Sequence, residues 1–221
     1  MRLLRPRGVY APQEDTELLA QAARGELRRL CAEPRPAVDV LDVGTGTGAL
    51  ALMAAGCPGA RVTAVDISWR AVLAARLNAW RLGLPVTVLR GDLTTPVRGR
   101  RFDLVLSNPP YVLSPAPLRG GPERAWNAGA DGRQILDRLC ADAPGLLTES
   151  GVLLLVQSAL SGVDPTLDML RDGGLSARVE LRTTIPFGPV MARHAAWLEQ
   201  RGLIGPEERK EDLVVIRAQR D

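Results

Sequence analysis

The chain has 221 residues, of which 46% are hydrophobic and 24% charged, and its formal net charge at neutral pH is +3. This length suits one α/β domain with a full core, and no apolar run approaches the ~20 residues that a membrane-spanning helix requires. The positive charge is too weak to identify a partner.

Helical and strand patterns alternate along the chain. A helical pattern opens at Glu14 and ends near Gly25 or Leu30. The later segments are strands at 38–43, 61–67, 86–90, 102–107, 151–157, 179–184 and 212–218, and helices at 49–55, 69–82, 134–147, 164–172 and 190–201. A loop at 113–131 is too long for a plain connector, which suggests a functional role. The alternation predicts an α/β fold with a parallel sheet covered by helices on both faces.

The three cysteines, Cys31, Cys57 and Cys140, are widely spaced and include no Cys-x-x-Cys pair. This spacing predicts reduced, packed thiols and neither disulfides nor metal ligands. The basic start of the chain lacks the apolar core and cleavage site of a signal peptide. We therefore expect a cytoplasmic protein without a metal site.

A glycine-rich turn between the first strand and the second helix predicts a ligand site. Gly44, Gly46 and Gly48 let the backbone approach a ligand at a helix N-terminus. The Gly-x-Gly-x-Gly spacing differs from the dinucleotide fingerprint, and no Gly-Lys-Ser/Thr follows as in a P-loop. Asp42 would repel a pyrophosphate but would attract an ammonium or sulfonium cation.

Acidic residues stand at the ends of three successive strands. In addition to Asp42, Asp66 is placed to accept both hydroxyls of a ribose, and Asp92 with Leu93 is placed to bracket an adenine ring. Each acid alone is equally suited to cap a helix. Together with the glycine turn, they favour a cationic nucleoside without phosphates, bound in the crevice at the strand ends. S-adenosylmethionine is such a ligand.

The segment Ser107-Asn108-Pro109-Pro110-Tyr111 follows the fourth strand. The two prolines fix φ and offer no N–H, and Asn108 precedes a proline, so the backbone is stiff and extended. Taken alone, this is also typical of a proline-rich turn. The segment would hold a planar amide nitrogen or an aromatic amine by its N–H groups, with Tyr111 against its face. Rigidly placed acceptors of this kind suit nitrogen methylation.

These motifs resemble the class I S-adenosylmethionine methyltransferases and, within them, the HemK family of protein-glutamine N5-methyltransferases. The segment 108–111 looks like the family's Asn-Pro-Pro-Tyr substrate clamp, although related tetrapeptides serve DNA and RNA amino-methylases. Residues 9–16 are similar to the Val-Tyr-x-Pro-x-Glu-Asp-Thr opening of the short, archaeal and eukaryotic-type branch. Residues 123–126, 129–133 and 136–138 are similar to further family motifs.

The resemblance implies a Rossmann-like fold whose seven-stranded, mostly parallel sheet has one antiparallel strand and helices on both faces. It implies S-adenosylmethionine as cofactor, S-adenosylhomocysteine as product, and no metal. The implied cofactor-binding residues are Thr16, Asp42, Gly44, Thr45, Gly46, Gly48, Asp66, Ile67, Asp92, Leu93 and Asn108. The implied catalytic residues are Asn108, Pro109 and Tyr111, and Pro110 joins them in holding the substrate.

In this family the substrate is the glutamine of a Gly-Gly-Gln tripeptide in class I peptide-chain release factors, and some short-branch members are reported to act on lysine. Short-branch relatives use a small zinc-binding activator subunit at the sheet edge, which corresponds here to residues 86–89. The long N-terminal helical domain of the bacterial enzymes has no counterpart. We expect a single domain over residues 1–221, with a short N-terminal extension (1–36). An insertion at about 183–210, which includes His194 and Trp197, has no match in the family.

Three alternatives remain at this point. The first keeps the chemistry but changes the acceptor to an adenine or cytosine amino group of DNA or RNA, or to a protein lysine. The second is an N-methyltransferase acting on a small molecule, with the insertion as a lid. The third is a cofactor-binding scaffold without turnover. The weak charge and the motif at residues 9–16 favour the release-factor substrate over nucleic acid.

Overall fold

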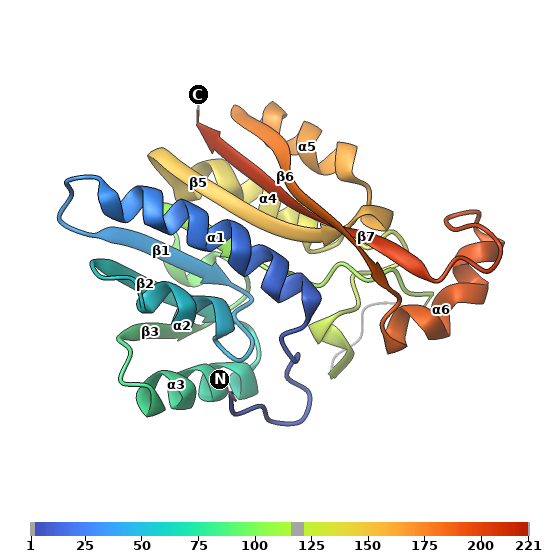
Figure 1. The fold of residues 1–221 in the computed structure, drawn as a ribbon, viewed down its shortest axis with the longest axis horizontal. Coiled ribbons are helices and arrows are strands. Elements are labelled where there is room, and N and C mark those ends of the chain that lie inside the picture. Colours follow the sequence, from blue (N-terminus) through green and yellow to red (C-terminus); the bar gives the residue numbers. More distant parts are fainter. Residues whose placement is uncertain (1–2, 116–121, 221) are drawn as a thin grey trace.

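A seven-stranded sheet runs through the computed structural model, which describes residues 3–115 and 122–220 (Figure 1). Its strand order is β3-β2-β1-β4-β5-β7-β6. The strands are β1 (Val38–Val43), β2 (Ala60–Asp66), β3 (Val86–Arg90), β4 (Phe102–Ser107), β5 (Leu147–Ser158), β6 (Leu175–Pro186) and β7 (Lys210–Arg220). β7 runs antiparallel to both of its neighbours, β5 and β6, and the other pairings among the described strands are parallel. The expected fold class is therefore confirmed.

Helices cover both faces of the sheet. One face carries α1 (Glu14–Ala32), α2 (Ala49–Ala55) and α3 (Trp69–Arg81), and the other carries α4 (Leu136–Leu146) and α5 (Val163–Asp172). Neighbouring residues of one strand therefore enter different cores: Leu104 and Leu106 pack with the first set, and Val105 packs with the second. Burial on both sides explains why the central strands read as unbroken apolar runs.

The ends of several elements agree with the sequence pattern, and the largest differences lie in the last three strands. β5 begins at Leu147, within the range predicted as helix, and its pairing with β4 shifts register between Phe102 and Leu104. Gly151 lies at this irregularity, where a Cβ would come within 2.6 Å of the Phe102 carbonyl oxygen. β6 and β7 are longer than predicted. In β6 exposed residues alternate with buried or half-buried ones, and in β7 the ends extend beyond a continuous buried run.

The range 183–210 comprises the end of β6, the helix α6 (Pro189–Gln200) and the return into β7. Figure 1 shows α6 at one end of the molecule, away from the other helices. Of the expected loop at 113–131, residues 116–121 lie outside the described part, and residues 122–125 form a short 3-10 turn. Among the described residues, no helix is both long and apolar enough to cross a membrane.

Candidate active site

A cleft of about 440 Å³ lies at the carboxyl ends of the parallel strands. This position is the crevice in which open α/β sheets bind ligands, and the volume is in the range of small-molecule sites. The N-terminal segment, the glycine turn, the ends of β2 and β3 and the segment after β4 all contribute to it. The sequence-predicted residues that line it are Thr16, Gly44, Thr45, Gly46, Asp66, Ile67, Asp92, Leu93, Asn108, Pro109, Pro110 and Tyr111.

The glycine turn is left-handed at three positions within five residues. The φ angles of Gly44, Gly46 and Gly48 are 75°, 56° and 87°, a region that favours glycine. Gly48 does not line the cleft. A Cβ there would lie 3.2 Å from the Ala75 Cβ, so this glycine allows α2 and α3 to pack closely.

Asp42 also lies outside the cleft, beneath the turn. Its Oδ2 accepts hydrogen bonds from the Thr45 hydroxyl at 2.6 Å and from the Ala51 N–H at 3.1 Å, which fastens the turn to the first residues of α2. The side chain is buried, and burial raises the pKa of Asp42 to about 6. The structure thus gives Asp42 a position from which it shapes the cleft without facing it.

We expect Asp42 to make stability depend on pH. Because its folded-state pKa is about 6 against the ordinary 3.8, the folded protein holds a proton that the unfolded chain releases between these values. The free energy of unfolding should therefore fall as pH rises through this window, by roughly 3 kcal/mol from this group. Urea unfolding of wild type and Asp42→Asn from pH 4 to 6.5 measures it. The slope should be smaller in the variant, and parallel curves would contradict the assignment.

Asp66 links the glycine turn to α3. Its Oδ2 accepts from the Gly46 N–H at 2.9 Å, and its Oδ1 accepts from the Ser68 N–H at 2.8 Å. Burial raises the pKa of this carboxyl, and the two backbone donors oppose the shift. The carboxylate is therefore held in one orientation at the edge of the cleft.

The end of β3 contributes two further cleft residues. Asp92 forms an ion pair with Arg138 at 2.6 Å, and Arg138 also lines the cleft. Leu93 has a φ of 47°, which is uncommon for a residue with a branched side chain. Such conformations persist where the surrounding structure fixes them, and they occur often at functional sites. Arg138 is absent from the predicted site residues, although it stands in one of the family motifs.

The side chain of Asn108 is fixed from the N-terminal side of the chain. Its Nδ2 donates a hydrogen bond to the Thr16 hydroxyl at 3.1 Å. This bond uses the amide N–H and does not engage the Oδ1 acceptor. Thr16 and Asn108 were predicted to share the cofactor region, and the structure brings them together across 92 positions of sequence.

Asp15 is the residue that joins the clamp to α1, and it was not among the predicted site residues. Its side chain is buried, and its Oδ2 accepts the hydroxyls of Tyr10 at 2.8 Å and Tyr111 at 2.9 Å. Burial, reinforced by this carboxylate, raises the pKa of both phenols, which keeps them protonated as donors. The helical spacing could have indicated that Asp15 is buried, because Asp15 precedes Leu19 by four positions and so lies on the face of α1 that packs inward.

Tyr111 is also held at its backbone. The Ser161 hydroxyl donates to the Tyr111 carbonyl at 2.9 Å. Gly132 passes close by, since a Cβ there would lie 2.5 Å from the same oxygen. The phenol and the main chain of Tyr111 are thus fixed from three different parts of the sequence.

The segment after the clamp pairs with the described end of the long loop. The N–H of Val112 donates to the Trp126 carbonyl at 3.0 Å, and the Val112 carbonyl accepts from the Ala128 N–H at 3.1 Å. Trp126 lines the cleft. This pairing makes Trp126 a wall of the cleft beside the clamp.

α6 supports that wall from outside. His194 Nδ1 lies 3.0 Å from the Leu113 carbonyl oxygen, and its ring centroid lies 5.9 Å from that of Trp126. Leu113 is buried in a small separate core whose other buried members are Met191, Ala195, Leu198 and Ile204. The segment that was expected to be an insertion therefore packs, through α6, behind the clamp and Trp126.

We expect His194→Ala to weaken substrate binding without affecting cofactor binding. Losing one hydrogen bond and one ring contact behind Trp126 should raise the KM for the methyl acceptor about fivefold to tenfold. The cofactor Kd should stay unchanged, because the glycine turn and Asp66 lie elsewhere in the cleft. His194→Asn retains a donor near the Nδ1 position and should restore part of the loss. Equal effects on both ligands would show a general structural role instead.

Comparison with known proteins shows the family to which the chain belongs. Residues 22–172 match the methyltransferase small domain family. The chain is 40% identical over 203 residues to the release factor glutamine methyltransferase of Deinococcus radiodurans, covering 88% of this chain and 70% of that one. It is 40% identical over 156 residues to the enzyme of the same name from Moorella thermoacetica, covering 66% of this chain and 53% of that one. The chain thus spans about half the length of the Moorella protein.

A solved structure shares the fold over almost its whole length. A chain of the E. cuniculi Mtq2–Trm112 complex, described as responsible for methylation of the eRF1 translation termination factor, superposes with a TM-score of 0.64. The superposition covers 97% of this chain and 99% of that one, at 23% sequence identity. At this identity the likeness shows the fold alone.

Proposed function

Since the chain belongs to the methyltransferase small domain family and, within it, to the HemK-type glutamine methyltransferases, we propose that it methylates a release factor. The acceptor is the side-chain amide nitrogen of the glutamine in a Gly-Gly-Gln motif. The observation that carries this proposal is the clamp: Asn108 is fixed by Thr16, and Tyr111 by Asp15, beside a cleft of cofactor size.

The cleft fits S-adenosylmethionine as cofactor. The left-handed glycines leave the floor of the turn free of side chains, and Asp66 presents a fixed carboxylate where ribose hydroxyls would donate to it. Leu93 and Ile67 supply apolar surface for a base, and Asp92 supplies an acceptor for an amino group. The bound cofactor would supply an electrophilic methyl group and a thioether leaving group.

The difficult partner in this reaction is the amide nitrogen, because resonance delocalises its lone pair into the carbonyl. The Asn108 Oδ1 and the Pro109 carbonyl can accept its two N–H groups, which raises electron density on nitrogen and aims it at the methyl group. Tyr111 holds the plane of the amide. With the cofactor bound, this nitrogen would accept the methyl group, the thioether would be the leaving group, and one N–H proton would leave to solvent.

This proposal is tested by transfer of labelled methyl from S-adenosylmethionine to a purified release factor. Label should enter the wild-type factor and should be absent from a Gln→Ala variant of its Gly-Gly-Gln motif. RNA and DNA acceptors test the main alternative in the same assay.

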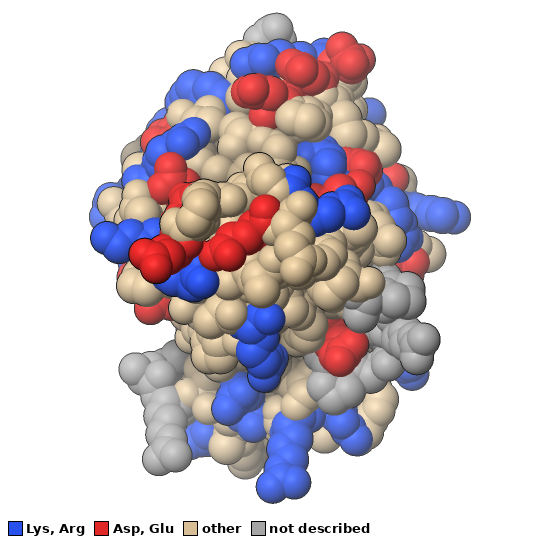
Figure 2. Space-filling view, turned by 90° about the vertical axis from the view of Figure 1, so that its right-hand side faces the viewer, with Lys and Arg blue, Asp and Glu red and all other residues tan. Residues whose placement is uncertain are grey.

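The charge distribution bears on this nucleic-acid alternative. Figure 2 shows acidic and basic side chains interspersed over much of one face, with basic ones gathered at its lower end. Salt-sensitive transfer to nucleic acid, without transfer to the factor, would overturn the proposal.

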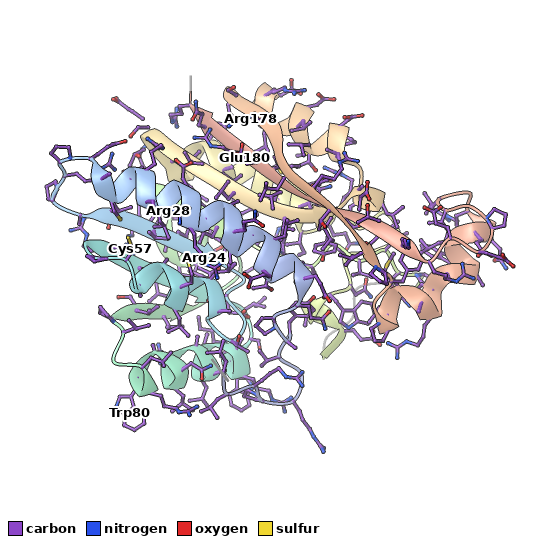
Figure 3. All side chains as sticks on the ribbon, in the orientation of Figure 1. Arg24, Arg28, Cys57, Trp80, Arg178 and Glu180 are labelled. Atoms are coloured by element: carbon purple, nitrogen blue, oxygen red, sulfur yellow. The ribbon has the colours of Figure 1, made fainter. Side chains whose placement is uncertain are left out.

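We also propose that a small activator subunit, zinc-binding as in the short-branch relatives, covers α3 and the adjoining edge strand β3. Four large apolar side chains of α3 recur on one face and are exposed: Trp69 (56%), Leu73 (45%), Leu77 (40%) and Trp80 (79%). Figure 3 shows Trp80 pointing away from the body of the protein. Exposed apolar surface of this kind marks an interaction site. β3 is the edge strand of the sheet on this side, where a partner strand can pair, and the Arg76 side chain donates to its Val88 carbonyl.

The double variant Leu77→Ser/Trp80→Ser should lose binding to a Trm112-type protein by at least about tenfold, because it removes the most exposed part of the stripe. Leu203→Ser, an exposed apolar residue elsewhere (38%), is the matched control and should bind like wild type. Titration by isothermal calorimetry measures both. Unchanged affinity of the double variant would exclude α3 as the docking face.

A further inference from the structure

The side chains of Cys31 and Cys57 are in contact, although 26 positions of sequence separate the two residues. Cys31 lies in the last turn of α1, and Cys57 follows the end of α2 by two residues. Their Sγ atoms are 2.8 Å apart, within S–H···S hydrogen-bond contact. Figure 3 shows Cys57 at the end of the molecule where α1 terminates.

The backbone holds both thiols in place. Cys31 is part of a continuous helix, and Cys57 sits in a turn whose N–H donates to the Ala54 carbonyl at 3.0 Å and whose carbonyl accepts from the Ala60 N–H at 3.2 Å. Both side chains are half-buried, so a small oxidant can reach them, whereas Cys140 is buried in the core on the opposite face of the sheet. The two sulfurs need only a small approach to reach the ~2.05 Å of a disulfide.

The two helices have a shared role at their other ends. The first turn of α1 contains Asp15 and Thr16, which hold the clamp, and α2 begins directly after the glycine turn. A covalent link between Cys31 and Cys57 would therefore tie together the far ends of the two helices that build the cleft.

From this geometry we propose that Cys31 and Cys57 form a reversible disulfide that locks α1 to the turn after α2. The co-reactant is a low-molecular-weight disulfide such as oxidised glutathione. The thiolate of one cysteine attacks it and releases one thiol, and the other cysteine then displaces the second thiol as the protein disulfide forms. Because the two sulfurs face each other, either thiol can make the first attack, and the other then resolves the mixed disulfide.

The test counts free thiols in the full chain after equilibration with a series of glutathione buffers. Wild type should fall from three thiols to one, and the matched control Cys140→Ser from two to none. Cys31→Ser and Cys57→Ser should form no intramolecular disulfide. Peptide mapping without reduction should identify the 31–57 link, and the melting temperature of the oxidised protein should rise by roughly 5–10 °C. Dithiothreitol should reverse both changes.

Four results would overturn the proposal. Wild type could retain three thiols at the most oxidising poise, Cys140 could appear in the linked peptide, or the linkage could join two chains. Stable mixed disulfides with glutathione, without the internal link, would also overturn it, because they would show that the second cysteine cannot reach the oxidised one. None of these outcomes depends on the methyl acceptor, so the proposal stands or falls separately from the proposed function.

Discussion

Replacing Asn108 with alanine should abolish methyl transfer to a release factor while the affinity for S-adenosylmethionine stays within a few-fold of wild type. The structure supports this separation, because the Asn108 side chain is fixed by Thr16 at 3.1 Å, whereas the glycine turn and Asp66 form another wall of the cleft. Losing an acceptor that acts on the reacting nitrogen should cost roughly a thousandfold in turnover.

Single-turnover transfer and calorimetric cofactor binding, measured on the same preparation, test this separation. Asn108→Asp retains an acceptor oxygen and loses the N–H that bonds Thr16. It should therefore keep more turnover than the alanine variant. If Asn108→Ala lost turnover and cofactor affinity in equal measure, the residue would be part of the cofactor site and not of the acceptor clamp.

Asp15→Asn should lower kcat on the order of a hundredfold, because charged hydrogen bonds contribute about 1.5–3 kcal/mol each and Asp15 accepts two phenols. The Asp15 Oδ1 also accepts from the N–H and the hydroxyl of Thr16. An amide at this position has one acceptor oxygen and cannot accept from both phenols and from Thr16 together. Tyr111 should therefore lose its fixed position against the substrate amide. Steady-state kinetics with the release factor measures the loss.

The control for this variant is Glu14→Gln, which makes the same change of charge one residue earlier on the exposed side of α1. It should retain wild-type kinetics. A similar loss of kcat in both variants would assign the effect to the charge of the first helical turn, and the hydrogen bonds of Asp15 would then have no special role.

The sequence was sufficient for the parts of the fold that local patterns determine. β1, β3 and β4 and the helix α2 have the predicted bounds, because apolar runs end at glycine, proline or charged residues. The expected family is also confirmed. The predicted start of β5 at residue 151 was wrong: the strand begins at Leu147, and its irregular pairing with β4 near Gly151 interrupts the apolar pattern.

Contacts between distant residues limited the prediction of the site. Asp15 reaches Tyr111 across 96 positions, and His194 reaches Leu113 across 81, and no local pattern encodes either contact. For Asp42 the sequence correctly predicted a place at the end of the first strand, beside the glycine turn. It did not predict the direction of the side chain, which lies beneath the glycine turn and bonds Thr45. The roles of the individual cleft residues stay predictions until variants are measured.

Tandem mass spectrometry of a release factor, after incubation with the protein and S-adenosylmethionine, tests the central claim most directly. The account predicts one added methyl group on the side-chain nitrogen of the glutamine in the Gly-Gly-Gln motif, and none when Asn108→Ala replaces the wild-type protein. A methyl group on a lysine or at any other position of the factor would contradict it, as would transfer to the glutamine that persists in the Asn108→Ala variant.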